Sequence, residues 1–315
     1  MKLGVVMDPI ESINFKKDST LAMMLEAQTR EHELFYMTPD SLYINESGAF
    51  AIAKTINVKN EPTGWFDFKE EMQIKLSDLD VILMRQDPPF NSNFIYNTYV
   101  LESAEREGVL VVNKPASLRD CNEKVFATEF PECCTPFLVT SDLSLLRSFI
   151  DEHKDTVIKP LDGMGGSSIF RIRSSDPNLN VILETVTESY STKVMIQTYI
   201  PEIVDGDKRI LLLNGVPMNA AVARVPAEGE LRGNLAAGAS AVARSLTEKD
   251  LWICEQVGPR LKELGLVLVG LDIIGDYLTE INVTSPTCFK EYENLCDINV
   301  AFNFLETLEG LHKND

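Results

Sequence analysis

The stretch LDIIGDYLTEINVTSPT, residues 271–287, decides how the second half of the chain folds. Apolar runs on either side of Gly275-Asp276 predict a β-hairpin, with one strand over Val267–Ile274 and the other over Tyr277–Val283. Apolar side chains occupy both faces of each strand, which indicates that the hairpin is buried. The polar residues that interrupt them carry the oxygen ligands that Mg²⁺ prefers, and they are Asp272, Glu280 and Asn282.

A shared metal site places a condition on this hairpin. Glu280 and Asn282 are two residues apart, so they lie on one face of their strand. A two-residue turn would pair Asp272 with Thr279 and direct Glu280 to the other face, so a metal site requires a β-bulge or an odd-length connection. The alternative is a half-exposed hairpin with ordinary polar residues. The apolar surroundings argue against it, because buried acids need partners.

A lysine followed by a glycine-rich loop lies upstream. A short strand that ends at Lys159 runs into the segment PLDGMGGSS, residues 160–168. Backbone N–H groups at Gly163, Gly165 and Gly166 can approach phosphate oxygens while the lysine supplies a point charge. The segment matches neither the P-loop nor the dinucleotide-binding fingerprint. A plain turn with a solvated lysine is therefore the alternative.

Arginines gather at strand ends and in one long loop. A hairpin is predicted over Lys208–Leu213 and Val216–Val225 around an Asn-Gly turn, with Pro217 delaying the second strand. The segment Pro226–Ser245 has no clear apolar period, which predicts a long loop. An arginine fork binds carboxylate or phosphate, although isolated surface arginines more often form weak ion pairs. The candidates are Arg85, Arg209, Arg224 and Arg232.

The first 120 residues alternate apolar strands with helical segments, which predicts a parallel sheet covered by helices. Strands are expected over Lys2–Met7, Leu79–Arg85 and Val109–Asn113. Asp18 is placed to cap a helix that begins near Ser19. Asp120 and Glu123 have the spacing of a capping box and predict a helix that carries Lys124.

Composition narrows the class of protein. The 315 residues include 29 basic and 48 acidic side chains, a formal net charge of −19 that disfavours nucleic acid and anionic membranes as partners. No apolar run approaches the length of about eighteen residues that a transmembrane helix needs. The N-terminal apolar run is too short for a signal peptide, so we expect a cytoplasmic protein whose six cysteines are reduced.

Several segments, in this order, resemble the prokaryotic glutathione synthetase family over almost the whole chain. They are Val6–Ile10, Met84–Phe90, Asn113–Pro115, Leu118–Lys124, Lys159–Gly166, Arg232–Gly238 and Leu271–Thr287. The resemblance implies an α/β (α+β) ATP-grasp fold, in which an N-terminal parallel-sheet α/β domain precedes two subdomains that clamp ATP. We expect these parts over residues 1–121, 122–200 and 201–315. The last part would carry the metal site and a mobile loop over residues 226–245, where Ala239–Ala243 departs from the family pattern.

The same resemblance implies roles for individual residues. Those that hold the ATP phosphates are Lys124, Lys159, Gly163, Gly165 and Gly166. Those on the adenine and ribose side are Gln197, Thr198, Tyr199, Ile200 and Asp207. The ligands of Mg²⁺ or Mn²⁺ are Asp272, Glu280 and Asn282. Arg209 and Arg224 would stabilise the transferred phosphoryl group. The remaining substrate contacts are Arg85 and Arg232 for anionic groups, and Ser285 and Thr287 near glycine.

The implied reaction joins γ-glutamylcysteine to glycine with ATP through an acyl phosphate, in an enzyme that is commonly a homotetramer. Because an acyl phosphate hydrolyses in water, the long loop is the expected lid. Two alternatives stay open: an ATP-grasp ligase with a different amine acceptor, and a nucleotide-binding protein that has lost catalysis. Release of ADP from ATP, measured with and without the two substrates, separates the three hypotheses.

Overall fold

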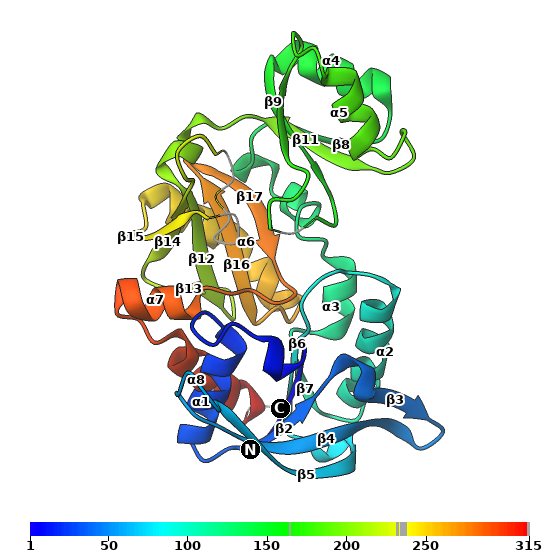
Figure 1. Ribbon diagram of the computed structural model, residues 1–315, viewed down its shortest axis with the longest axis vertical. Helices are drawn as coiled ribbons and strands as arrows, with labels where there is room; N and C mark the ends of the chain where they lie inside the picture. The colour runs from blue at the N-terminus through cyan, green and yellow to red at the C-terminus, as the bar shows by residue number, and fades with distance from the viewer. Residues whose placement is uncertain (164, 231–232, 234–237, 314–315) are drawn as a thin grey trace.

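The computed structural model describes residues 1–163, 165–230, 233 and 238–313 of the chain. Among these residues, three β-sheets follow one another along the long axis of the molecule (Figure 1). The N-terminal sheet lies at one end, a four-stranded sheet lies at the other, and a six-stranded sheet lies between them. No helix of this described part is long and apolar enough to cross a membrane.

The N-terminal sheet is mixed, with the strand order β3-β4-β2-β1-β6-β7 and with β5 paired to β4. Its centre is parallel as predicted, because β1 lies parallel to β2 and β6, and β6 to β7. The antiparallel strands β3, β4 and β5 were not predicted; β5 is half-exposed and rich in charge, so its strand signal is weak. The strands are β1 (Lys2–Met7), β2 (Glu33–Met37), β3 (Leu42–Asn45), β4 (Gly48–Val58), β5 (Phe66–Lys75), β6 (Val81–Arg85) and β7 (Leu110–Val112).

Helices cover this sheet. The Asp18 carboxylate accepts a hydrogen bond from the backbone N–H of Leu21 and begins α1, which confirms the predicted cap. The C-terminal helix α8 packs beside α1, so the two ends of the chain lie close together (Figure 1). The helices of this part are α1 (Ser19–Thr29), α2 (Ser92–Arg106), α3 (Pro115–Asp120), α7 (Phe289–Cys296) and α8 (Val300–His312).

The four-stranded sheet has its own core. Its order is β10-β9-β11-β8, and neighbouring strands are antiparallel. Two helices pack on it, and the buried cluster between them, which includes Leu146, Leu183 and Ile196, draws all its described buried members from residues 146–196. The elements are β8 (Phe137–Thr140), α4 (Leu143–His153), β9 (Asp155–Pro160), β10 (Phe170–Arg173), α5 (Leu179–Val186) and β11 (Val194–Thr198).

The six-stranded sheet shares its core with the N-terminal sheet. Its order is β15-β14-β12-β16-β17, with β13 beside β12. One buried cluster joins Leu212 and Leu271 of this sheet to Met84 and Leu118 of the N-terminal part. The elements are β12 (Asp207–Leu213), β13 (Val216–Pro217), β14 (Ala221–Val225), β15 (Ser240–Arg244), α6 (Glu248–Glu263), β16 (Leu268–Ile274) and β17 (Tyr277–Asn282).

One predicted helix is absent from the described residues. The spacing of Asp120 and Glu123 predicted a helix start, but α3 ends at Asp120 because Pro115 already begins it. The next residues form a turn, in which the Asn122 side chain accepts hydrogen bonds from the backbone N–H groups of Lys124 and Val125. The lysine is therefore presented from a turn.

The predicted loop over residues 226–245 is shorter than expected. Residues 240–244 form β15, an edge strand that pairs with β14, because a short run that includes Val242 can extend beside an existing strand. The break at Pro217 is confirmed, since β13 ends there and β14 begins at Ala221. Thr247 caps α6, because its hydroxyl accepts a hydrogen bond from the backbone N–H of Asp250.

Candidate active site

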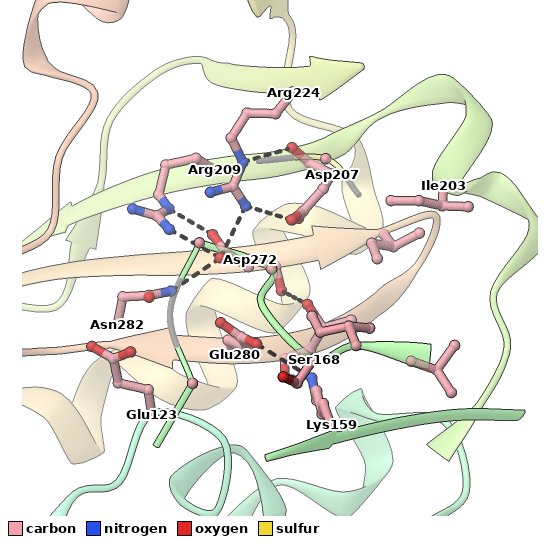
Figure 2. A pocket seen from close by; sticks show the side chains of 18 of the residues that line it. Glu123, Lys159, Ser168, Ile203, Asp207, Arg209, Arg224, Asp272, Glu280 and Asn282 are labelled. Carbon is pink, nitrogen blue, oxygen red and sulfur yellow. Dashed lines mark hydrogen bonds and ion pairs between the residues drawn. The ribbon is translucent and has the colours of Figure 1, made fainter. Parts of the chain in front are cut away.

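A cleft of about 680 Å³ opens between the four-stranded and six-stranded sheets. One wall consists of β9, β11 and the glycine-rich turn after β9, and the other consists of β12, β14, β16 and β17. The segment after β17 lines the cleft as well. Figure 2 shows Lys159 on one side of the cleft, facing Glu280 and Asp272 from the six-stranded sheet.

The hairpin that carries the predicted metal ligands has the bulge that a shared site requires. The strand register pairs Asp272 with Glu280 and shifts between Asp272 and Ile273, so that Ile273 pairs with Leu278. The Nδ2 group of Asn282 donates to the Asp272 carboxylate at 3.1 Å. The hairpin geometry therefore brings the three predicted ligands together.

Two arginines hold Asp272 in its charged form. Arg209 donates from Nε and Nη2 to the two carboxylate oxygens at 2.5 and 3.0 Å, and Arg224 approaches to 2.9 Å. Burial alone would raise the pKa of Asp272, but the two guanidinium groups hold that pKa below its usual range. A buried charge network of this kind is costly to break, because each partner left alone would be a desolvated ion.

Asp207 is a second acid beside the same arginines. Arg224 donates to its Oδ2, while its Oδ1 is buried and has no hydrogen-bond partner among the described residues. Burial, together with the charges of Asp272 and Glu280, raises the pKa of Asp207 to about 7, against the opposing effect of Arg224. A buried acceptor without a donor favours a ligand that supplies one, such as a hydroxyl group.

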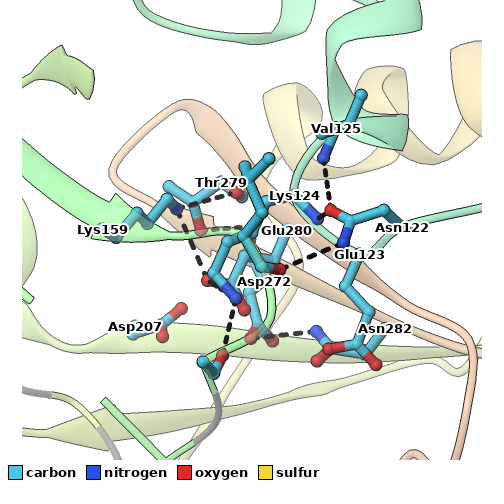
Figure 3. Close-up of polar contacts among 12 residues, drawn as sticks. Asn122, Glu123, Lys124, Val125, Lys159, Asp207, Asp272, Thr279, Glu280 and Asn282 are labelled. Carbon is cyan, nitrogen blue, oxygen red and sulfur yellow. Dashed lines mark hydrogen bonds and ion pairs between the residues drawn. The ribbon is translucent and has the colours of Figure 1, made fainter. Parts of the chain in front are cut away.

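Two lysines converge on Glu280 (Figure 3). Its Oε1 lies 3.4 Å from Nζ of Lys159 and 3.6 Å from Nζ of Lys124. Burial alone would raise the pKa of Glu280, but the two lysines together keep it lowered. Lys124 also donates to the carbonyl of Gly163 at 2.8 Å, which ties the glycine-rich turn to the floor of the cleft.

The glycine-rich turn exposes its backbone to the cleft. Gly165 and Gly166 have φ values of 66° and 77°, in the left-handed region that favours glycine. A Cβ atom at Gly165 would meet nothing within 4 Å, so the space above the backbone is open. Such a turn suits the close approach of phosphate oxygens to backbone N–H groups.

The end of β11 forms an apolar slot with a polar edge. Gln197, Tyr199 and Ile200 line it, and the guanidinium of Arg171 lies 3.5 Å from the centre of the Tyr199 ring. Arg171 is held in turn by Asp155, through hydrogen bonds of 2.8 and 2.6 Å. The other apolar residues of the slot are Val157, Ile203 and Ile274. This arrangement suits a planar base with polar edges.

The segment after β17 is fixed to the N-terminal part. Arg85 is buried and donates to the carbonyl of Pro286 and to the hydroxyl of Thr20, both at 3.0 Å. Asn113 donates to the carbonyls of Leu268 and Val283 at 2.8 and 2.6 Å. These bonds hold β16 and the residues that follow β17 in a fixed position.

The structure gathers most of the predicted site residues around one cleft. Lining it are Lys159, Gly163, Gly165, Gly166, Gln197, Tyr199, Ile200, Asp207, Arg209, Arg224, Asp272, Glu280, Asn282, Ser285 and Thr287. Lys124, Thr198 and Arg85 are not among the residues that line it, and Arg232 lies outside the described residues. Four further residues that line the cleft were not predicted as site residues from the sequence: Glu123, Thr284, Arg171 and Cys288.

The donor chemistry of the hairpin fits a hard divalent cation. In the described part of the chain, no three His, Cys, Asp or Glu side chains converge on one point. Asp272 and Glu280 supply carboxylates, and Asn282 supplies an amide oxygen, so a metal here needs further oxygens from phosphates or water. Mg²⁺ is held in this way in many nucleotide sites, because it keeps several waters and takes few protein ligands.

Comparison with known families accounts for nearly the whole chain. Residues 1–119 match the prokaryotic glutathione synthetase N-terminal domain, and residues 123–297 match the ATP-grasp domain of the same enzyme. The chain is 55% identical over 309 residues to a glutathione synthetase of Pseudomonas putida, with 98% of each chain covered. It is 53% identical over 309 residues to that of Vibrio parahaemolyticus, again with 98% of each covered.

Solved structures of lower sequence identity share the fold. The D-cycloserine synthetase DcsG has a TM-score of 0.69 at 13% identity and covers 98% of this chain and 99% of its own. The ATP-grasp ligase PsnB, solved with a minimal precursor, Mg and ADP, has a TM-score of 0.64 at 15% identity, with 99% and 98% covered. At this identity the likeness establishes the ATP-grasp fold alone.

Proposed function

The chain belongs to the prokaryotic glutathione synthetase family and is an ATP-dependent ligase, and we propose that its cleft joins γ-glutamylcysteine to glycine. The observation that carries the proposal is the meeting of three features in one cleft. A slot for a planar base adjoins an open glycine-rich turn with Lys159, and both face the buried cluster of Asp272 with Arg209 and Arg224. These are the parts that phosphoryl transfer to a carboxylate requires.

In the first step, a carboxylate oxygen of γ-glutamylcysteine attacks the γ-phosphorus of ATP, and the bond from that phosphorus to the ADP oxygen breaks. The product is an acyl phosphate, whose leaving group is phosphate rather than oxide. The lysines and the backbone of the glycine-rich turn hold the nucleotide phosphates, and Asp207 accepts a ribose hydroxyl at its unpaired oxygen. A magnesium ion held by Asp272, Glu280 and Asn282 would supply charge neutralisation on the phosphates.

In the second step, the amine of glycine attacks the carbonyl carbon, and the bond to the phosphate oxygen breaks. Arg209 and Arg224 are the proposed stabilisers of the transferred phosphoryl group and of the oxyanion. Both guanidinium groups are held by buried carboxylates, which support a fixed orientation toward the cleft. Ser285 and Thr287 lie on the cleft wall and are the proposed contacts of glycine.

Water must be kept from the acyl phosphate. Gly229 and Gly233, from the segment between β14 and β15, line the cleft and support the prediction that this segment covers the site. Part of the segment lies outside the described residues, so its role as a lid stays a prediction. Arg85 donates to the carbonyl of Pro286 and does not line the cleft. We therefore propose that it contributes to substrate binding indirectly, by positioning the segment that carries Ser285 and Thr287.

The decisive experiment is the release of ADP from ATP and Mg²⁺ by the purified protein, with and without γ-glutamylcysteine and glycine. We expect full turnover and stoichiometric glutathione only when all substrates are present. A ligase with a different acceptor would form glutathione no faster than background while another amine supported turnover. A nucleotide-binding protein without catalysis would release no ADP under any condition, and either result would overturn the proposal.

Three further features are proposed, of which the division into parts and the oligomeric state rest on family resemblance. The chain divides functionally into residues 1–121, 122–200 and 201–315, with ATP held between the last two. The enzyme is a cytoplasmic homotetramer, and the net charge of −19 supports the absence of nucleic acid among its partners. Analytical ultracentrifugation of the purified protein would test the oligomeric state directly.

A further inference from the structure

Glu123 is a carboxylate of the cleft that none of the roles above uses. It lies in the turn between α3 and the residues that precede β8, immediately before Lys124. Its carbonyl accepts a hydrogen bond of 2.8 Å from the backbone N–H of Ile281, which fixes the turn against β17. Its side chain lines the main cleft and also a small pocket of about 40 Å³ behind it. Figures 2 and 3 both place the carboxylate on the side of Asn282.

The carboxylate is held in one orientation but has no cationic partner. The hydroxyl of Thr284 donates to its Oε1 at 2.7 Å. Among the described residues, no lysine or arginine forms a salt bridge with Glu123, and no hydrogen bond reaches its Oε2. The neighbouring bases are already engaged, because Lys124 and Lys159 pair with Glu280 and Arg209 pairs with Asp272. An inward-facing carboxylate without a base favours a ligand that is itself a cation or a strong donor.

The other acids of the cleft differ from Glu123 in this respect. Asp207 and Asp272 are bound to arginines, and Glu280 is bound to two lysines. Asp87 also lines the cleft, but its side chain is exposed at the rim. Glu123 therefore combines three properties: it is half-buried, it is oriented by a hydroxyl donor, and it forms no salt bridge with a described basic side chain.

We infer that Glu123 is the group that holds the attacking amine of the acceptor substrate, by accepting a hydrogen bond from its ammonium or amino group. The inference rests on the proposed function. Thr284, which donates to Glu123, directly precedes Ser285 in the chain, and Ser285 and Thr287 line the cleft where the acceptor is proposed to bind. The carboxylate lies on the side of Asn282 (Figure 2), which donates to Asp272, and Asp272 is the partner of the two phosphoryl-stabilising arginines.

The test uses two nucleophiles with the full-length enzyme. Glycine is an ammonium ion at neutral pH, whereas hydroxylamine is uncharged and traps an acyl phosphate as a hydroxamate. In Glu123→Gln we expect the KM for glycine to rise about 10-fold to 100-fold, the range that loss of a charge-assisted hydrogen bond produces. The KM for γ-glutamylcysteine should change less than about twofold, and hydroxamate formation should continue.

Two further variants serve as an independent test and as a control. Thr284→Val removes the hydroxyl that orients the carboxylate, and it should raise the KM for glycine in the same direction by a smaller factor. This variant also tests the inference if Glu123→Gln does not fold. Glu132→Gln makes the same change at an exposed glutamate that does not line the cleft; it is the matched control and should leave the KM for glycine unchanged.

Three outcomes would overturn the inference. An unchanged KM for glycine in Glu123→Gln would show that the carboxylate does not hold the amine. A raised KM for γ-glutamylcysteine would assign Glu123 to the amino group of the donor instead. Loss of hydroxamate together with glutathione would assign it to activation of the donor carboxylate. Failure of the unmodified enzyme to form either product would instead refute the proposed function.

Discussion

The four-stranded and six-stranded sheets face each other across one cleft, yet they are attached to the rest of the molecule in different ways. The buried core of the four-stranded sheet comes entirely from its own residues, 146–196, among those described. The six-stranded sheet shares two large buried clusters with the N-terminal part. One wall of the cleft is therefore part of a large packed body, while the other is a small unit with few buried links to it.

The two walls also differ in chemistry. The six-stranded sheet carries the buried cluster of Asp207, Arg209, Arg224 and Asp272, whose members hold one another in place. The four-stranded sheet and the residues that follow it contribute most of the apolar slot, the glycine-rich turn and, among the described residues, one buried lysine, Lys159. The groups proposed for bond making therefore lie on the fixed wall. The proposed nucleotide contacts are divided: the glycine-rich turn and most of the slot lie on the small, separable wall, whereas Asp207 and the metal ligands lie on the fixed one. Such a division permits opening for nucleotide exchange without disturbing the reactive geometry.

The largest expected effect is on the fixed wall. Asp272→Asn keeps the shape of the side chain but removes the charge that would bind a cation and pair with two arginines. We expect the turnover rate to fall about 10³-fold, equivalent to about 4 kcal/mol. Steady-state kinetics over a range of Mg²⁺ concentrations measure this. Asp276→Asn, at the exposed turn of the same hairpin, is the control. Turnover by Asp272→Asn within about tenfold of the parent would contradict the metal assignment.

The second expected effect is on stability, and it distinguishes the core of the four-stranded sheet from the core that the six-stranded and N-terminal sheets share. Leu183 is fully buried in the small core, and Leu212 is fully buried in the shared core. Leu183→Ala should cost about 3 kcal/mol. Backbone amides of the four-stranded sheet should lose protection against hydrogen exchange, while those of the N-terminal sheet keep it. Leu212→Ala, the matched variant, should lower protection in both larger sheets. Equal loss in all three sheets after either substitution would mean that the small unit does not open independently.

Sequence patterns predicted the strand that ends at Lys159 and the hairpin strands of the six-stranded sheet, because their signals are local, but they did not predict β10, β11 or β15. Apolar runs, and the helix cap at Asp18 in the N-terminal part, are recognised from a few neighbouring residues. The bulge after Asp272 could be stated only as a requirement of a shared metal site, because the position of a bulge depends on how both strands pair with their neighbours. The pairing of Arg209 with a carboxylate 63 positions away needed the folded sheet. Glu123 was missed because its spacing from an earlier acid was interpreted as a helix cap.

The third effect is on nucleotide binding by the separable wall. Lys159→Met keeps the length of the side chain but removes its charge, and the charge of Glu280 then faces Lys124 alone. We expect ATP to bind about 30-fold more weakly, about 2 kcal/mol, with little change in the affinity for γ-glutamylcysteine. Isothermal titration calorimetry measures both affinities. Lys154→Met, at the exposed end of α4, is the control. Normal ATP affinity with normal single-turnover rates would remove Lys159 from the site.

The smallest expected effect concerns an ion pair at the edge of the separable wall. Hydrogen bonds from Arg171 and Arg173 hold the pKa of Asp155 at about 2, below its usual value of 3.8. A lowered carboxyl pKa contributes stability that is present above the unfolded value and is lost as pH falls toward the folded value. Because Asp155 is 30% exposed, solvent screening reduces the contribution to about 1 kcal/mol. Asp155→Asn should therefore lower the free energy of unfolding at pH 7 by about that amount.

The difference in unfolding free energy between Asp155→Asn and the parent should shrink between pH 4 and pH 2, and urea unfolding at several pH values measures it. Asp151→Asn, an exposed acid on α4, should cause no such change. A difference for Asp155→Asn that persisted undiminished toward pH 2 would show that the loss comes from packing, and the contrast between the walls would then rest on their cores alone.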